Sequence, residues 1–257
     1  MRAEETPRDL VGSLERGLGV MEILAAHPAG LTLTETAEKA GLTRAGARRF
    51  LLTLAATGYA TQTGRLFTLS PRLLSVAHTW LQGTSLWGFA EPIMRRTAAE
   101  LQESCSATIL SGEDVVYVAR VAGPRIVSLE LHVGAHLPAY CTAMGRVLLS
   151  DLPEPELETF LARARIRPNT VKTVTDRGKL AEIIAGARAA GYCAVDEELE
   201  IGLRSLAVPV RDRSGRLVAA INVSTQSARH SVEEMEREFL PRLRKAAASI
   251  EDFFVVQ

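Results

Sequence analysis

The segment from Gly41 to Leu54, GLTRAGARRFLLTL, limits the possible fold of this chain more than any other stretch. Its apolar residues recur at positions i, i+3, i+4 and i+7: Ala47, Phe50, Leu51 and Leu54. That spacing predicts a helix with one buried face, which begins at Arg44, ends at about Thr57 and has Thr43 as its N-cap. The arginines of the segment must then lie on the exposed side.

A short helix is predicted immediately upstream. In LTLTETAEKAGL, Thr34 is positioned to cap a helix that ends at about Lys39, and Gly41 supplies the turn. Two helices joined by a glycine-containing turn form a helix-turn-helix, whose second helix enters the major groove of DNA. Before them, LERGLGVMEILAAHPAG predicts a further helix with Ser13 as its N-cap and a stop at residues 28–30.

A hairpin and another helix are predicted after this recognition helix. Residues 59–61 and 66–69 have the pattern of short strands around a Thr-Gly turn, which places Arg65 at the tip of a wing. Beyond Pro71, an apolar stripe with helical spacing indicates a linker helix.

Charge is distributed unevenly along the chain. The 30 basic and 30 acidic residues give a formal net charge of zero, which argues against a generic polyanion binder. However, no acidic residue occurs between Glu38 and Glu91, and this stretch contains six basic ones: Lys39, Arg44, Arg48, Arg49, Arg65 and Arg72. A solvated helical face is the simple interpretation of such a run. Its place on a predicted helix-turn-helix and wing favours a DNA-binding surface.

We predict DNA contacts from seven residues of the helix and the hairpin: Thr43, Arg44, Ala45, Gly46, Arg48, Arg49 and Arg65. The arginines can neutralise phosphates or pair with guanine O6 and N7, and the sequence does not distinguish these roles. Ala45 and Gly46 have no side-chain donors, so they allow a close approach of the backbone to DNA or contact with a thymine methyl group.

The remainder of the chain, from about residue 86, has an α+β pattern. Helices are predicted over about 94–101, 142–149, 154–164, 179–190 and 232–253, and strands include 206–211 and 217–224. Antiparallel strands with helices on their faces indicate a sensor-type sheet rather than a doubly wound nucleotide-binding one.

Enzyme and metal motifs are missing from the sequence. It contains no P-loop, G-x-S-x-G elbow, G-x-G-x-x-G fingerprint or H-E-x-x-H helix. His132 and His136 lie in a predicted strand and turn, so neither a metal nor a cofactor is expected. Cys105, Cys141 and Cys193 are far apart, which argues against disulfides. An alternative remains in which Cys141 is the nucleophile of a metabolic enzyme, although no oxyanion donor or orienting acid is evident nearby.

A ligand pocket is the better interpretation of this region. The segment LPAYCTAMGRVLLS runs from an extended loop into a helix at about Thr142. The N–H groups of residues 141–145 would then gather at the positive end of the helix, which can bind a carboxylate. The alternative is an ordinary capped core helix. Ser205, Asn222 and Ser224 interrupt apolar runs, and buried polar groups need a partner from protein or ligand.

No apolar run approaches the roughly 20 residues that span a bilayer, and the start MRAEETPRD is not a signal peptide. We therefore expect a cytoplasmic protein with no membrane partner.

The assembled pattern resembles the IclR family of bacterial transcriptional regulators over essentially the whole chain. Four motifs carry the resemblance: SLERGLGVMEIL, LTLTETAEKAGLTRAGARRFLLTLAATGYA, LPAYCTAMGRVLLS and GYCAVDEELEIGLRSLAVPVRDRSGRLVAAINVS. It implies an α+β fold with a winged helix-turn-helix domain (1–69), a linker helix (70–87) and a GAF-like effector domain with an antiparallel sheet and flanking helices (88–257). It also implies homodimers or homotetramers on a palindromic double-stranded DNA operator.

The motifs look closest to those of regulators of aromatic-acid breakdown, which act on protocatechuate, 4-hydroxybenzoate and β-ketoadipate pathways. The resemblance and the predicted helix start at about Thr142 together give ten expected effector-binding residues. These are Cys141, Thr142, Ala143, Met144, Gly145, Asp196, Glu198, Ser205, Asn222 and Ser224. Family members often have Ser or Thr where this chain has Ala45 and Gly46, so those hydroxyl contacts are not expected. The predicted function is a ligand-responsive regulator of a catabolic operon that senses a small organic acid. A ligand-binding module with a protein partner is a further alternative.

Overall fold

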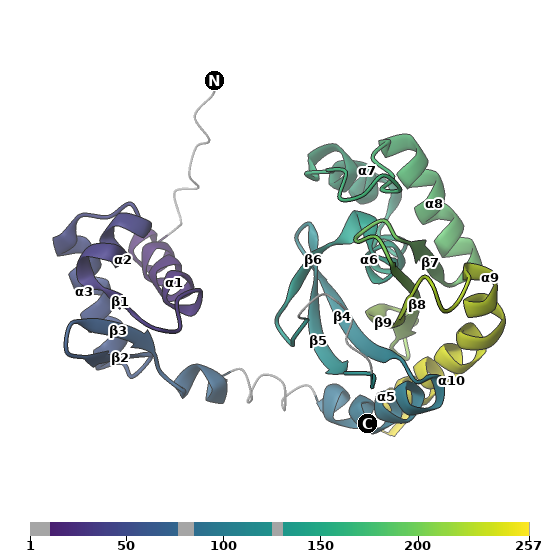
Figure 1. The fold of residues 1–257 in the computed structure, drawn as a ribbon, viewed down its shortest axis with the longest axis horizontal. Helices are drawn as coiled ribbons and strands as arrows, with labels where there is room; N and C mark the ends of the chain where they lie inside the picture. Colours follow the sequence, from purple (N-terminus) through teal and green to yellow (C-terminus); the bar gives the residue numbers. More distant parts are fainter. Residues whose placement is uncertain (1–10, 77–84, 125–130, 257) are drawn as a thin grey trace. The chain divides into compact units, whose positions relative to one another are not determined.

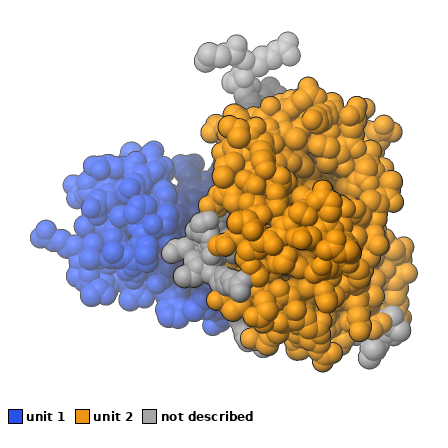
Figure 2. Space-filling view, turned by 45° about the vertical axis from the view of Figure 1, so that its right-hand side comes forward, with its two compact units in different colours: residues 1–83 blue, residues 84–257 orange. Residues whose placement is uncertain are grey.

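The computed structural model describes residues 11–76, 85–124 and 131–256. The chain divides into two compact units, residues 1–83 and 84–257 (Figure 2). Of the expected linker helix, residues 72–76 are helical, and residues 77–84 lie outside the described residues.

Besides the helical residues 72–76, the described part of the first unit contains three helices and a small antiparallel sheet (Figure 1). The helices are α1 (Gly12–Ala25), α2 (Leu33–Lys39) and α3 (Arg44–Ala56). The strands are β1 (Leu31–Thr32), β2 (Ala60–Thr63) and β3 (Leu66–Leu69), in the order β1-β3-β2. The prediction of a helix-turn-helix followed by a β-hairpin is confirmed.

The predicted buried face of α3 is also confirmed. Ala47 and Leu51 are completely buried, and Phe50 and Leu54 pack against the core of this unit. Thr43 caps the helix, because the backbone N–H of Gly46 donates to its Oγ1 over 3.1 Å.

Two predicted caps upstream are wrong. α1 begins after Val11 with no side-chain cap, so Ser13 lies inside the helix. α2 is capped by Thr32 and not by Thr34, because Thr32 and Glu35 form a capping box in which the Glu35 carboxylate accepts from the Thr32 N–H over 2.8 Å. The sequence contained this signal, since only Thr32 has a glutamate three residues later.

The second unit is built on a six-stranded sheet in the order β6-β5-β4-β9-β8-β7. Its strands are β4 (Ser104–Ser111), β5 (Asp114–Val121), β6 (His136–Pro138), β7 (Cys193–Asp196), β8 (Leu203–Arg211) and β9 (Leu217–Gln226). Every neighbouring pair is antiparallel, as predicted.

Helices cover both faces of this sheet (Figure 1). On one face lie the 3-10 turn η1 (Ala139–Cys141), α6 (Ala143–Leu149), α7 (Glu154–Arg163) and α8 (Arg177–Ala190). On the other lie α5 (Ser85–Leu101) and α10 (Leu240–Glu251). In the described part of the chain, no helix combines the length and hydropathy needed to cross a membrane.

The predicted single helix over 232–253 is interrupted. It consists of α9 (Val232–Glu234), a π-helical segment η2 (Met235–Phe239), α10 and the short α11 (Phe253–Val256). Pro241 stands at the start of α10 and has no N–H to donate to the carbonyl four residues earlier, which accounts for a change of helix type at this point.

Helix α6 is buried along its whole length. A Cβ atom at Gly145 would lie 2.6 Å from the carbonyl carbon of Ala139 in η1 and closer still to its oxygen. Gly145 therefore allows the backbones of α6 and η1 to touch, and this contact sets the position of the start of the helix.

We expect Gly145→Ala to destabilise the second unit by about 3 kcal/mol or more, because backbone atoms cannot move aside as a flexible side chain does. Gly186→Ala is the matched control, since Gly186 lies within α8 with nothing within 4 Å of an added Cβ. It should stabilise by about 0.5–1 kcal/mol. Chemical unfolding of both variants measures the difference, and similar stabilities would contradict the packing argument.

Candidate functional site

The exposed side of α3 carries the predicted DNA contacts. Arg44, Arg48 and Arg49 are exposed on the helix, and Arg65 is exposed in the turn between β2 and β3. Within the described residues, none of these four guanidinium groups has a side-chain hydrogen bond or an ion pair. Their positive charge is therefore not neutralised by a described part of the protein.

The small residues at the start of α3 have a structural role as well. Ala45 is exposed, whereas a Cβ at Gly46 would lie 3.2 Å from Thr43 Oγ1. Glycine at position 46 thus leaves room for the Thr43 cap. The predicted contacts of Thr43, Ala45 and Gly46 with DNA stay predictions.

Three of the expected effector residues lie together on one face of the large sheet. Ser205 of β8 is paired in register with Ser224 of β9, and directly paired residues share a face. Asn222 lies two positions before Ser224, and its Nδ2 donates to Ser224 Oγ over 2.9 Å.

Strand β4 adds three polar residues that the sequence analysis missed. Ser104 is paired with Ser224 and Ser106 with Asn222, and Thr108 lies two positions further along the same face. All three are buried. The alternation Ser-Cys-Ser-Ala-Thr over 104–108 is a strand pattern that could have identified them.

Two polar atoms on this face lack a hydrogen-bond partner among the described residues. Thr108 Oγ1 and Asn222 Oδ1 are buried and accept or donate no hydrogen bond within the described part of the protein. The side chains are 0% and 2% exposed. Leaving a buried polar atom unpaired costs about 1–3 kcal/mol, so this face is suited to receive a polar ligand.

The start of α6 packs against the face of the sheet that carries these polar residues. Ala143 and Met144 of the helix lie in one hydrophobic cluster with Ala207 and Ala220 of the sheet. Thr142 caps the helix, because its Oγ1 accepts from the Gly145 N–H over 3.2 Å. The alternative of an ordinary capped core helix therefore describes these contacts fully. A ligand contact of residues 141–145 stays a prediction.

The cysteine thiols are not poised for nucleophilic chemistry. Burial raises the pKa of Cys141 and of Cys105 to about 12, and that of Cys193 to about 11. A thiol with such a pKa is protonated near neutral pH, whereas the thiolate is the nucleophile. Cys141 Sγ instead accepts a hydrogen bond of 3.3 Å from Asn169 Nδ2.

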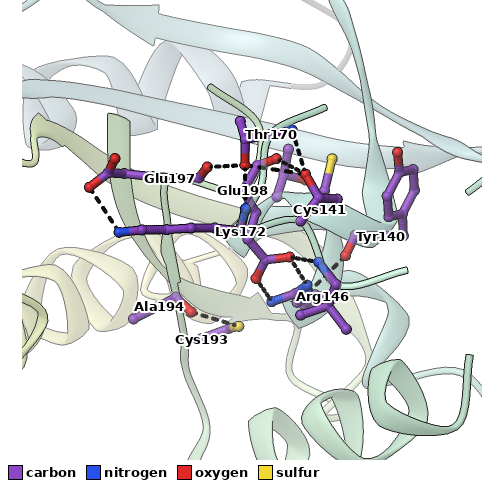
Figure 3. Close-up of polar contacts among 12 residues, drawn as sticks. Tyr140, Cys141, Arg146, Thr170, Lys172, Cys193, Ala194, Glu197 and Glu198 are labelled. Carbon is purple, nitrogen blue, oxygen red and sulfur yellow. Dashed lines mark hydrogen bonds and ion pairs between the residues drawn. The ribbon is translucent and has the colours of Figure 1, made fainter. Parts of the chain in front are cut away.

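Glu198 forms a buried ion pair with Arg146 of α6 (Figure 3). Arg146 Nη1 and Nη2 donate to Glu198 Oε1 and Oε2, each over 2.7 Å, and the Val174 N–H donates to Oε2 over 2.9 Å. Arg146 Nε donates to the carbonyl oxygen of Tyr140 over 2.8 Å. Both Glu198 oxygens are thus engaged within the protein, and the pair joins α6 to the segment between β7 and β8.

Asp196 lies on the other face of the sheet from the polar cluster. It is paired in register with Arg204, one position before Ser205, and forms ion pairs with Arg204 and, over 2.8 Å, with Lys172. Burial alone would raise the pKa of Asp196, but hydrogen bonds and charge from Arg204 and Lys172 lower it below its usual value. The structure therefore does not bring Asp196 to the cluster of Ser205, Asn222 and Ser224, and its contact with an effector stays a prediction.

Residues 11–76, 85–124 and 131–256 contain no group of three or more His, Cys, Asp or Glu side chains that could hold a metal ion.

We expect Glu198→Gln to lower the free energy of unfolding by about 3–5 kcal/mol, because it leaves the buried Arg146 charge uncompensated. Glu91→Gln breaks the exposed pair with Arg95 and should cost at most about 1 kcal/mol. Urea unfolding of the two variants provides the comparison. Equal losses would mean that the buried pair does not stabilise the fold as its geometry indicates.

Two sequence profiles match the chain. Residues 78–252 match the profile of the bacterial transcriptional regulator IclR C-terminal domain, and residues 13–64 match the IclR helix-turn-helix domain.

Relatives and solved structures agree with this assignment. The Pca regulon regulatory protein of Pseudomonas putida is 41% identical over 94% of this chain and 84% of its own length. A Rhodococcus sp. RHA1 protein described as a transcriptional regulator, RHA06195, has 43% identity and a TM-score of 0.84 over 96% of this chain and 99% of its own. An IclR homologue from Microbacterium hydrocarbonoxydans, solved with 4-hydroxybenzoate, has 25% identity and a TM-score of 0.84 over 95% of this chain and 100% of its own.

The helix-turn-helix, the six-stranded sheet and these matches agree with the sequence prediction and exclude the alternative of a metabolic enzyme. The chain belongs to the IclR family of bacterial transcriptional regulators and is a DNA-binding regulator.

Proposed function

We propose that this regulator binds a palindromic operator in double-stranded DNA and responds to a small aromatic acid that binds on the polar face of the large sheet. The observation that carries the ligand assignment is that two buried atoms, Thr108 Oγ1 and Asn222 Oδ1, have no hydrogen-bond partner among the residues that the structure describes. A regulator of this kind acts in the cytoplasm, where bacterial DNA lies.

The DNA half of the proposal rests on the arginines of the first unit. Arg44, Arg48 and Arg49 project from the exposed side of α3, and Arg65 marks the tip of the hairpin. In a winged helix-turn-helix, α3 enters the major groove and the wing lies beside the phosphate backbone. We assign base or phosphate contacts to the three helix arginines and a phosphate contact to Arg65.

The ligand half combines polar and apolar surface. Ser106, Asn222 and Ser224 supply hydrogen-bonding groups, and Tyr117 and Ala220 supply apolar surface on the same face. An aromatic ring with polar substituents needs both kinds of contact. The homologue from M. hydrocarbonoxydans was solved with 4-hydroxybenzoate, which supports an aromatic acid here.

An apolar groove in the first unit supports a homodimer or homotetramer. The groove has a volume of about 890 Å³ and is lined by residues of α1, α3 and the segment after β3. Leu14, Leu18 and Val76 in its lining are 61%, 46% and 50% exposed. Exposed apolar clusters of this kind mark interaction surfaces, and a two-fold assembly matches the two halves of a palindromic operator.

An effector alters DNA binding only through its different affinities for the two states of the protein, and such coupling is typically about 1–3 kcal/mol. We expect the aromatic acid to change operator affinity by this amount, and an electrophoretic mobility assay with and without 4-hydroxybenzoate tests the function as a whole. Unchanged mobility across 4-hydroxybenzoate and its hydroxylated analogues would overturn the aromatic-acid assignment.

Arg48→Ala should weaken operator binding by about 1–3 kcal/mol and, if Arg48 contacts a phosphate, reduce the slope of log affinity against log salt by about 1. Arg95→Ala is the control, because it removes the same charge from an exposed position on α5 in the other unit. Fluorescence anisotropy over a salt series measures both quantities. An Arg48→Ala curve that superimposes on wild type would remove Arg48 from the interface.

Asn222→Ala should weaken binding of 4-hydroxybenzoate by about 0.5–1.5 kcal/mol, the usual contribution of one hydrogen bond, and should affect benzoate less because benzoate lacks the hydroxyl. Gln226→Ala, at the exposed end of the same strand, controls for changes to β9. Calorimetric titration gives the affinities. If Asn222→Ala binds both acids as wild type does, the ligand does not reach this face.

A further inference from the structure

Arg120 extends the polar face of the sheet by one strand. It lies on β5 and is paired in register with Ser106, which is itself paired with Asn222 on β9. Arg120, Ser106 and Asn222 thus form a row across three adjacent strands, which Figure 1 shows side by side. Two strand spacings, about 10 Å, separate the first and last backbone positions of this row.

A β-bulge places Arg120 on this face. β4 pairs Ala107 with Ala119 but Thr108 with Tyr117, so Val118 is an extra residue in β5. Without it, Tyr117 and Arg120 would point to opposite faces, because they are three positions apart. With it, both share the face of Thr108 and Ser106. Bulges of this kind often re-aim a side chain beside a functional site.

The guanidinium of Arg120 has no acidic partner in the described part of the chain. Its Nη1 donates to Ser106 Oγ over 3.3 Å, and no described carboxylate lies within ion-pair distance. Other half-buried or buried arginines of this unit differ: Arg146 is paired with Glu198 and Arg204 with Asp196. A half-buried cation beside unpaired buried polar atoms is suited to an anionic ligand.

The start of α6 offers less to an anion than the sequence suggested. The helix has seven residues, and two of its first N–H groups are already bonded: that of Gly145 to Thr142 Oγ1 and that of Arg146 to the Thr142 carbonyl. A full positive charge with a planar set of donors on β5 is the stronger partner for a carboxylate.

We propose that Arg120 binds the carboxylate of the effector, so that the ring lies along the row toward Asn222 and its hydroxyl reaches Asn222 Oδ1 or Thr108 Oγ1. This inference rests on the proposed function, because it assigns the orientation of an aromatic acid on the same face. It makes Arg120 the residue that selects acids over neutral aromatic compounds.

The test compares 4-hydroxybenzoate with its neutral analogue 4-hydroxybenzamide by calorimetric titration of the full-length protein. Arg120→Gln should weaken binding of the acid by about 10- to 100-fold and that of the amide by less than about 3-fold, because only the acid loses a charge-assisted bidentate contact. Arg120→Lys should retain the preference for the acid, with intermediate affinity. Arg95→Gln is the control for net charge, because it removes the same charge from an exposed position on α5, which covers the opposite face of the sheet.

The outcomes separate the two proposals. If wild type binds neither compound, the aromatic-acid function and the role of Arg120 both fail. If wild type prefers the acid and Arg120→Gln keeps that preference, the proposed function stands and the role of Arg120 is wrong. An equal loss of affinity for both compounds also overturns the role of Arg120, because it would indicate damage to the site rather than loss of a carboxylate contact. Retained binding of the amide shows that the variant is folded.

Discussion

The pairing of β4 with β9 is the constraint on which the second unit depends. It joins residues 104–108 to residues 220–224, more than a hundred positions later, at the centre of the sheet. The register places Cys105, Ala107, Ile221 and Val223 on the face that α5 and α10 cover. It places the serines, Thr108 and Asn222 on the face that α6 covers. A slip of one residue would exchange these faces and bury the polar set in the apolar core under α5 and α10, so the register is strongly specified.

Local signals in the sequence predicted the first unit well. The helical spacing of Ala47, Leu51 and their neighbours, the Thr43 cap and the hairpin around Gly64 all depend on residues within one turn or one strand of each other. The two wrong caps, Ser13 and Thr34, are local errors as well, because both residues lie inside the first turn of their helices. At α2 the reciprocal bond from Glu35 decides that Thr32 is the cap.

The candidate site was predicted only in part because its contacts are not local. Ser205, Asn222 and Ser224 could be identified as polar residues within apolar runs, but their neighbours on β4 and β5 depend on strand order and on a bulge. Nothing near Arg120 in the sequence shows that it shares a face with Asn222.

The acidic run over 196–200 illustrates the same limit. The family resemblance gives Asp196 and Glu198 of this run as effector contacts. In the structure, Glu198 is neutralised by Arg146, which lies 52 positions away, and Asp196 by Lys172 and Arg204. The partners of these carboxylates become visible only when the chain is folded, and the contact of Glu198 with an effector stays a prediction.

The free-energy cost of the unpaired polar atoms indicates how a ligand can control this regulator. Thr108 Oγ1 and Asn222 Oδ1 have no partner in the described part of the chain, and each raises the free energy of the ligand-free state by about 1–3 kcal/mol. A ligand that forms hydrogen bonds with both atoms recovers that energy only in a state that keeps the polar row intact. The coupling needed to alter operator affinity is of the same size, about 1–3 kcal/mol. The polar face can therefore supply enough differential binding energy for regulation without any other ligand contact. This requires that the row of Arg120, Ser106 and Asn222 is disturbed in one of the two states and not in the other.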